Sequence, residues 1–147
     1  MRSLLPATIL LLAAAGSATA GDNFEVKPAG AAGTVGEQLT ASVTITAKQG
    51  WHLNHEAPLS LKLAPPPGVV VAKPRLGRED LAVAGETQAR FDVGLTLAEP
   101  GRKVIAAEAG FVLCRADACQ PIKEKLSLTA EASPAKAAPG KRPSKQK

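Results

Sequence analysis

The chain has 147 residues and a formal net charge of +5, with 18 Lys and Arg against 13 Asp and Glu, two Cys and one Trp. This length suits one domain rather than several. The basic excess does not indicate a nucleic-acid-binding protein, because no basic patch interleaved with aromatic residues occurs in the central part of the chain.

The first 20 residues have the features of a secretory signal peptide. Arg2 precedes an apolar run from Leu4 to Ala15, and the small residues Ala18 and Ala20 flank Thr19 in the pattern of a cleavage site. We expect cleavage after Ala20 and a soluble product that is periplasmic or secreted. The apolar run is shorter than the roughly 20 residues that cross a bilayer.

Alternating apolar and polar residues follow, which predicts half-buried strands. The turn signals between them are Pro65-Pro66-Pro67-Gly68 and Glu99-Pro100-Gly101. The nearest helical candidate, residues 75–84, contains Gly77 and a mixed pattern. The sequence therefore predicts an all-β, immunoglobulin-like antiparallel β-sandwich over residues 21–132. Its expected strands are 39–46, 59–63, 69–71, 91–97, 103–113 and 122–129.

Residues 133–147 form a different region, composed of Ser, Pro, Ala, Gly, Gln and basic residues. Such a segment has no large apolar group to bury, so we expect a disordered tail. Its five basic residues could hold it against an anionic membrane surface. The simpler interpretation is a solubilising end without a partner.

The two cysteines, Cys114 and Cys119, lie at the end of the expected hairpin and are five positions apart. A chain reversal between them would bring their Cα atoms within disulfide range. Three interpretations stay open: thiol-disulfide exchange, a structural bridge, and metal binding. Two thiols alone fall short of a tetrahedral zinc site. A bridge across about six residues would be a weak staple, worth about 2 kcal/mol in the chain-entropy treatment.

A second notable segment, residues 50–58, contains the only Trp and both His. Trp51 suits a core position. We predict four supporting residues for the cysteines, namely Trp51, His52, Asn54 and Pro121. His52 and His55 with Glu56 could be read as a metal pair, but residues i and i+3 of a strand face opposite sides. No nucleophile elbow, phosphate-binding glycine loop or ligand triad indicates another enzyme class.

Four segments together resemble the N-terminal periplasmic domain of the thiol:disulfide interchange protein DsbD. They are GWHLNHEAPLSLKL, PPGV, RFDVGLTL and FVLCRADACQPIKEKLSL, and the resemblance extends from Gly50 to Leu128. It implies an immunoglobulin-like domain with a redox-active cysteine pair and a link to cytochrome c biogenesis. That family covers its pair with an aromatic-bearing loop; the matching stretch here, Lys73 to Asp80, has no aromatic residue and offers Leu76.

The resemblance also implies roles and partners. Cys119, which lies two residues before Pro121, would form the mixed disulfide, and Cys114 would resolve it. Electrons would come from a membrane-embedded donor and pass to thioredoxin-like periplasmic proteins. No cofactor or metal and no nucleic acid is expected. The alternative is a non-catalytic immunoglobulin-like binding domain with a structural disulfide.

Overall fold

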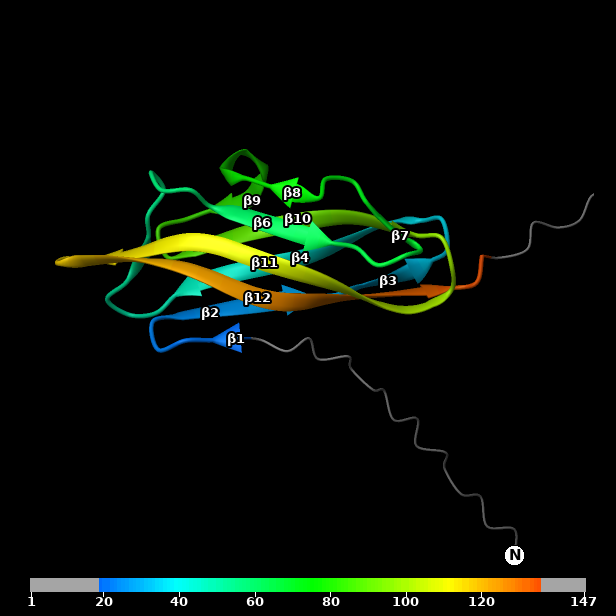
Figure 1. The fold of residues 1–147 in the computed structure, drawn as a ribbon, viewed down its shortest axis with the longest axis horizontal. Coiled ribbons are helices and arrows are strands. Elements are labelled where there is room, and N and C mark those ends of the chain that lie inside the picture. Colours follow the sequence, from blue (N-terminus) through cyan, green and yellow to red (C-terminus); the bar gives the residue numbers. More distant parts are fainter. Residues whose placement is uncertain (1–18, 136–147) are drawn as a thin grey trace, which may run out of the picture.

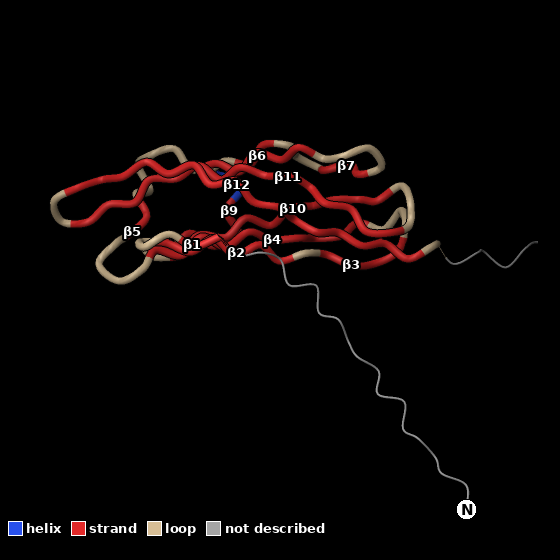
Figure 2. The backbone as a smooth tube through the Cα atoms, turned by 60° about the horizontal axis from the view of Figure 1, so that its bottom comes forward, coloured by secondary structure: helices blue, strands red, loops and turns tan. Residues whose placement is uncertain are grey.

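The computed structural model describes residues 19–135, which form two β-sheets packed face to face (Figures 1 and 2). One sheet has the order β1-β2-β4-β10-β7, with β9 also paired to β10. Its strands are β1 (Thr19–Ala20), β2 (Phe24–Ala29), β4 (Gln38–Ala47), β7 (Val69–Val71), β9 (Leu81–Ala84) and β10 (Gln88–Leu97).

The other sheet has the order β3-β12-β11-β6-β8, with β5 also paired to β11. It contains β3 (Ala31–Thr34), β5 (His52–Leu53), β6 (Ser60–Ala64), β8 (Arg75–Leu76), β11 (Gly101–Arg115) and β12 (Ala118–Ser133). A short 3₁₀ helix, η1 (Arg78–Asp80), precedes β9. No helix among residues 19–135 is long and apolar enough to span a bilayer.

The strand order is that of an immunoglobulin-like sandwich. The run β2-β4-β10-β7 corresponds to strands A-B-E-D, and β12-β11-β6 corresponds to G-F-C. Between β2 and β3 the chain crosses from one sheet to the other, and β3 then pairs in parallel with β12. Gly30 makes this crossing, where an added Cβ would lie 2.5 Å from the Thr129 carbonyl oxygen. The close backbone approach therefore requires glycine at this position.

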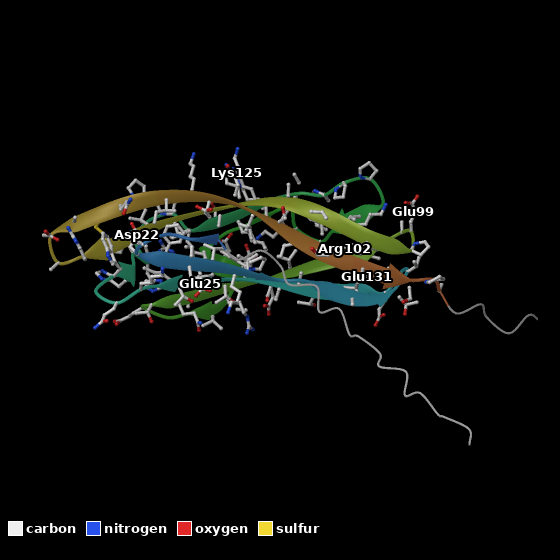
Figure 3. The ribbon with its side chains drawn as sticks, turned by 90° about the horizontal axis from the view of Figure 1, so that it is seen from below. Asp22, Glu25, Glu99, Arg102, Lys125 and Glu131 are labelled. Carbon is white, nitrogen blue, oxygen red and sulfur yellow. A yellow bond between two sulfur atoms is a disulfide. The ribbon has the colours of Figure 1, made fainter. Side chains whose placement is uncertain are left out.

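Alternation along the strands places one face of each sheet in the shared core. In β4, Leu39, Ala41, Val43 and Ile45 are buried while the residues between them are more exposed. Phe24 of β2 and Phe111 of β11 meet edge to face across the core, with ring centroids 5.4 Å apart. Charged side chains stay outside; Lys125 of β12, for example, points away from the sandwich (Figure 3).

The predicted strands are confirmed as β4, β6, β7, β10, β11 and β12, although β11 and β12 are longer than expected. Residues 75–84 contain no α-helix; they form β8, the three-residue 3₁₀ helix η1 and β9. The tail was expected from Ser133, yet Ser133 ends β12 and its carbonyl accepts a hydrogen bond from the Val35 amide at 2.9 Å.

The expectations for the two chain ends lie largely outside the described residues. Of the expected signal peptide, only Thr19 and Ala20 are described, as the short strand β1 paired with β2. Residues 136–147 of the expected tail lie outside the described range. The signal peptide and the tail therefore stay predictions.

Candidate functional site: the tip of the β11–β12 hairpin

The long hairpin formed by β11 and β12 extends beyond the rest of the sandwich at one end (Figures 1 and 2). Its strands pair from Gly101 and Ala132 up to Arg115 and Ala118, leaving a two-residue turn of Ala116 and Asp117. Such a tip is reached from outside the domain more easily than any position within the sheets. The residues at the tip are therefore the part of the hairpin that another molecule can reach most easily.

Cys114 and Cys119 are directly opposite each other at this tip and form a disulfide. Their Cα atoms are 4.0 Å apart, which is the close spacing of a cross-strand pair whose backbones do not bond to each other. The backbone N–H and C=O of Cys114 therefore point away from β12, toward β5. The hairpin predicted from the sequence is confirmed, and it places the cysteines in bonding register.

The two sulfur-bearing residues differ in exposure. Cys114 is only 6% exposed, whereas Cys119 is an exposed residue. An incoming thiolate must approach a disulfide sulfur along the S–S axis, so access decides which sulfur is attacked. Attack at Cys119 is open from solvent, and Cys114 is then the buried leaving group. The two cysteines therefore differ in how accessible they are from solvent.

Strand β5 runs beside β11 at the same level as the disulfide. His52 is opposite Cys114, Leu53 is opposite Leu113, and the Asn54 amide donates to the Val112 carbonyl at 2.9 Å. Directly opposite residues share a face of the sheet, and Leu53 and Leu113 are buried in the core. His52 therefore shares the opposite, outward face with the cysteines.

We call this outward surface the cysteine face: Cys119, Cys114 and His52 in one row across three strands, and Pro121, Val112 and Asn54 in the next row. Three of the four supporting residues predicted from the sequence, His52, Asn54 and Pro121, thus lie around the disulfide. The Asn54 side chain itself is engaged locally, because its Oδ1 accepts from the Glu56 amide at 2.9 Å.

Trp51 occupies the other face of the hairpin tip. It packs against the core, and the Arg115 guanidinium lies 5.1 Å from the centroid of its ring. Arg115 Nε also pairs with Asp117 Oδ1 at 2.9 Å, in an exposed ion pair. The charges of Arg115 and Asp117 therefore offset each other beside the disulfide, and Trp51 supports the tip rather than touching the sulfurs' face.

A second contact ties the tip to the opposite sheet. The Asn23 side-chain amide donates to Gln120 Oε1 at 2.7 Å, joining the turn before β2 to the residue after Cys119. Neither Asn23 nor the Trp51–Arg115 contact was singled out from the sequence. Each depends on residues 64 or more positions apart meeting in space, as the separation of 97 between Asn23 and Gln120 illustrates. No local sequence motif predicts such a contact.

Pro121 is opposite Val112 in β12, one step beyond the hydrogen-bonded pair Leu113 and Gln120. In this register the backbone nitrogen of residue 121 points outward, away from β11. A proline there removes no bond from the ladder and leaves a gap in the row of donors on the free edge of β12. Pro121 thus makes this edge beside Cys119 less able to accept another strand.

The other histidine serves a different purpose. His55 Nε2 lies 2.9 Å from the Gly85 carbonyl oxygen, and the Leu53 amide donates to the Glu86 carbonyl at 2.7 Å. These bonds connect β5 and the residues after it to the link between β9 and β10. Within residues 19–135, no three His, Cys, Asp or Glu side chains gather as a metal site would require.

The stretch that matches the covering loop of the resembled family lies elsewhere. Leu76 is 6% exposed and opposite Leu61 of β6, which is itself opposite Ala109 of β11. Ala109 is five residues before Cys114, or about 16 Å along a strand. Leu76 is therefore a core residue and does not cover the disulfide, contrary to what the sequence match suggested.

Residues 73–80 instead form a compact local network. The Gly77 amide donates to Asp80 Oδ2 at 2.8 Å, and Lys73 Nζ pairs with the same carboxylate at 2.6 Å. The backbone hydrogen bond from Gly77, followed by that from Lys73, lowers the pKa of Asp80 from its ordinary value. The hydrogen bond to Asp80 correspondingly raises the pKa of Lys73.

No protein-family model matches this chain, and no curated protein sequence matches it. Among solved structures, the fold is similar to the N-terminal periplasmic domain of ScsB from Proteus mirabilis, at 12% identity and a TM-score of 0.47. That similarity covers 74% of this chain and 47% of the other, so this chain spans about half the length of that one.

Two further structures have a similar arrangement of strands. WR4, an MSP family member from C. elegans, is 11% identical with a TM-score of 0.40, covering 74% of this chain and 97% of the other. The ASH/PapD-like domain of human CEP192 is 10% identical with a TM-score of 0.39, covering 91% and 99%. At these identities the similarities concern the fold alone.

Proposed function

We propose that this chain is a thiol-disulfide exchange protein in which the Cys114–Cys119 pair cycles between disulfide and dithiol. The observation that carries the proposal is the unequal exposure of the two cysteines at a projecting hairpin tip. In a pair of this kind, the exposed sulfur can react with a partner, and the buried sulfur can then resolve the mixed disulfide. The sequence resemblance to the N-terminal domain of DsbD supports the same function.

The place of the disulfide in the fold also supports exchange over stapling. In antibody domains the disulfide joins strands B and F across the core, so it holds two sheets together. Here the disulfide joins two residues that lie opposite each other on β11 and β12, the F and G strands. These strands already pair along the whole length of β11. A bond between strands that are already paired closes only a short loop, and its loss costs the fold little.

The proposed reaction has two steps. A thiolate of a partner dithiol attacks Cys119 Sγ, a mixed disulfide forms, and Cys114 leaves as a thiolate. The partner's second thiolate then attacks the mixed disulfide and releases Cys119. Two electrons thus pass from the partner dithiol to this chain, which becomes the dithiol while the partner becomes a disulfide; the reverse sequence reduces an oxidised partner. We propose thioredoxin-like proteins of the periplasm as partners and a membrane-embedded protein as donor.

The proposal is tested with single-cysteine variants and a thioredoxin as the partner. A Cys114→Ala variant keeps the exposed thiol and is expected to accumulate a mixed disulfide with a thioredoxin that lacks its own resolving cysteine and whose remaining cysteine carries thionitrobenzoate as the leaving thiolate. A Cys119→Ser variant keeps only the buried thiol and is expected to form none and to transfer no electrons, while its circular dichroism stays that of the folded domain. Transfer that persists in the folded Cys119→Ser variant would refute the proposed roles.

A binding domain with a structural disulfide is the second candidate. The observation in its favour is that a projecting F–G hairpin is where immunoglobulin-like variable domains carry a binding loop. In that case the disulfide would serve to stiffen the tip, and its reduction potential would be below about −300 mV, as for structural disulfides of secreted proteins. The potential therefore distinguishes the two candidates.

A further inference from the structure

We infer that His52 is the proton donor and ion-pair partner of the Cys114 sulfur when the disulfide opens. This inference rests on the proposed exchange function and adds to it a group that acts on the leaving thiolate. The carrying observation is the strand register, which sets His52 directly opposite Cys114 on β5 while Cys119 is directly opposite Cys114 on β12.

This register puts an imidazole next to the one sulfur that needs it. Side chains of directly opposite residues share a face, with Cβ atoms about 4.5–5.5 Å apart. Cys114 is buried at 6% exposure, and burial without a partner disfavours a thiolate. His52 is exposed, so it exchanges protons with solvent while lying beside the buried sulfur. The exposed Cys119 has water available and needs no such neighbour.

Three other charged groups near this row are engaged elsewhere. Arg115 lies on the opposite face against Trp51, and Asp117 pairs with it at 2.9 Å. Lys48, in the link before β5, donates to the Gly21 carbonyl at 2.6 Å. The titratable and charged side chains on the surrounding segments, apart from His52 and the two cysteines, are Asp22, Lys48, His55, Glu56, Glu86, Arg115, Asp117 and Lys123. In the strand ladder, His52 is the one placed opposite Cys114.

Opening of the disulfide places a negative charge on Cys114 Sγ. The incoming dithiol's thiolate forms a new S–S bond to Cys119 Sγ as the Cys114–Cys119 bond breaks, and the electron pair of that bond moves to Cys114 Sγ. The His52 imidazolium pairs with the new thiolate and can pass its proton to it, becoming neutral imidazole, which water reprotonates. In the reverse direction the neutral imidazole accepts the Cys114 proton. Imidazole suits this role because its ordinary titration lies between pH 5 and 8.

The test measures the Cys114 thiolate directly and needs no partner protein. In the Cys119→Ser variant Cys114 is the sole thiol, and its ionisation is followed by absorbance at 240 nm from pH 4 to 10. We expect His52→Gln or His52→Asn in that background to move the rise to higher pH, lowering the thiolate-to-thiol ratio at pH 7 about tenfold, which is one pKa unit. His55→Gln is the matched control and is expected to leave the curve unchanged.

A second readout uses the oxidised full chain with dithiothreitol as the dithiol at pH 7. The rate of disulfide opening should fall several-fold in His52→Gln and stay constant in His55→Gln. An unchanged thiolate curve in both folded His52 variants overturns the inference, even if exchange with thioredoxin is confirmed. Conversely, loss of thioredoxin exchange with a shifted thiolate curve overturns the proposed function but leaves the His52–Cys114 coupling established.

Discussion

Reducing the Cys114–Cys119 disulfide is expected to lower the free energy of unfolding by about 2 kcal/mol and to leave the domain folded. The bond closes a segment with a sequence separation of only 5. The chain-entropy treatment assigns about 2 kcal/mol to such a loop, against about 4.7 kcal/mol for a loop of about 100 residues. This property matters for function, because an exchange protein must persist in its reduced form.

The remaining contacts of the tip do not depend on the bond. The Arg115–Trp51 contact is of a kind worth about 0.5–1 kcal/mol at exposed sites. The Asn23–Gln120 hydrogen bond and the pairing of β11 with β12 also stay in place. The reduced hairpin should therefore keep its register, and the thiols should stay close enough to reoxidise without refolding.

The assay compares denaturant unfolding of the oxidised and the fully reduced protein, followed by far-ultraviolet circular dichroism. A Cys114→Ala/Cys119→Ala variant with and without reductant is the control, and its two curves should coincide. A reduced protein that is unfolded without denaturant, or that loses more than about 4 kcal/mol, would refute the reasoning, since a loss of that size belongs to bonds that close long loops.

Two further predictions concern other parts of the domain. Gly30→Ala should lower the free energy of unfolding by about 1–3 kcal/mol in chemical unfolding, because the added Cβ would meet the Thr129 carbonyl oxygen. The control is Gly94→Ala, in which the nearest atom to the added Cβ would be 3.4 Å away. Equal losses of stability in the two variants would contradict the claim that the chain at Gly30 packs too closely for a side chain. Asp80, whose pKa is lowered first by the Gly77 hydrogen bond, contributes stability above its unfolded value of 3.8 and loses it as the pH falls through the lower folded value. Between pH 6 and 2 the melting temperature of the native protein should therefore fall more than that of Asp80→Asn, and parallel curves would show that the network contributes nothing.

Much of the sandwich could be predicted because its long strands carry a strict two-residue period. The buried positions of β4, such as Val43 and Ile45, alternate with hydroxyl residues that stay partly exposed, and a register slip would move all of them to the wrong face. The turns rich in Pro and Gly after β6 and after β10 predicted where these two strands end. The short strands β1, β3, β5, β8 and β9 were not predicted, because two to four residues carry little periodic pattern. The six-residue β2 was not predicted either, and Pro28 interrupts its pattern.

The sequence indicated that the two cysteines lie on a hairpin, but it did not predict the geometry around them. Cys114 and Cys119 follow a long alternating strand, so a hairpin was foreseeable even though the Ala116-Asp117 turn lacks the Asn-Gly or Asp-Gly signal of tight hairpins. The unequal exposure of the two cysteines and the register of His52 depend on β5, which reaches β11 from a distant part of the sequence. Long-range pairing of this kind leaves no local pattern.

Leu76, which the resemblance offered as a covering residue, lies in the core for a related reason. A match between aligned segments placed residues 73–80 at the position of a covering loop, but the segment is pinned by its own bonds around Asp80 and by pairing of β8 with β6. Local hydrogen bonds and burial of Leu76 decided its place. The disulfide is therefore shielded on the Cys114 side, because Cys114 is buried in the domain, and not by residues 73–80.

The central claim is that the Cys114–Cys119 pair is a redox couple in use, and its equilibrium reduction potential tests this most directly. The oxidised chain is equilibrated against graded glutathione or dithiothreitol buffers, and the fractions of dithiol and disulfide are read by thiol labelling and mass. Exchange predicts a value between about −270 and −120 mV, the range of exchange proteins. A value well below about −300 mV would mark a structural bridge and contradict the account.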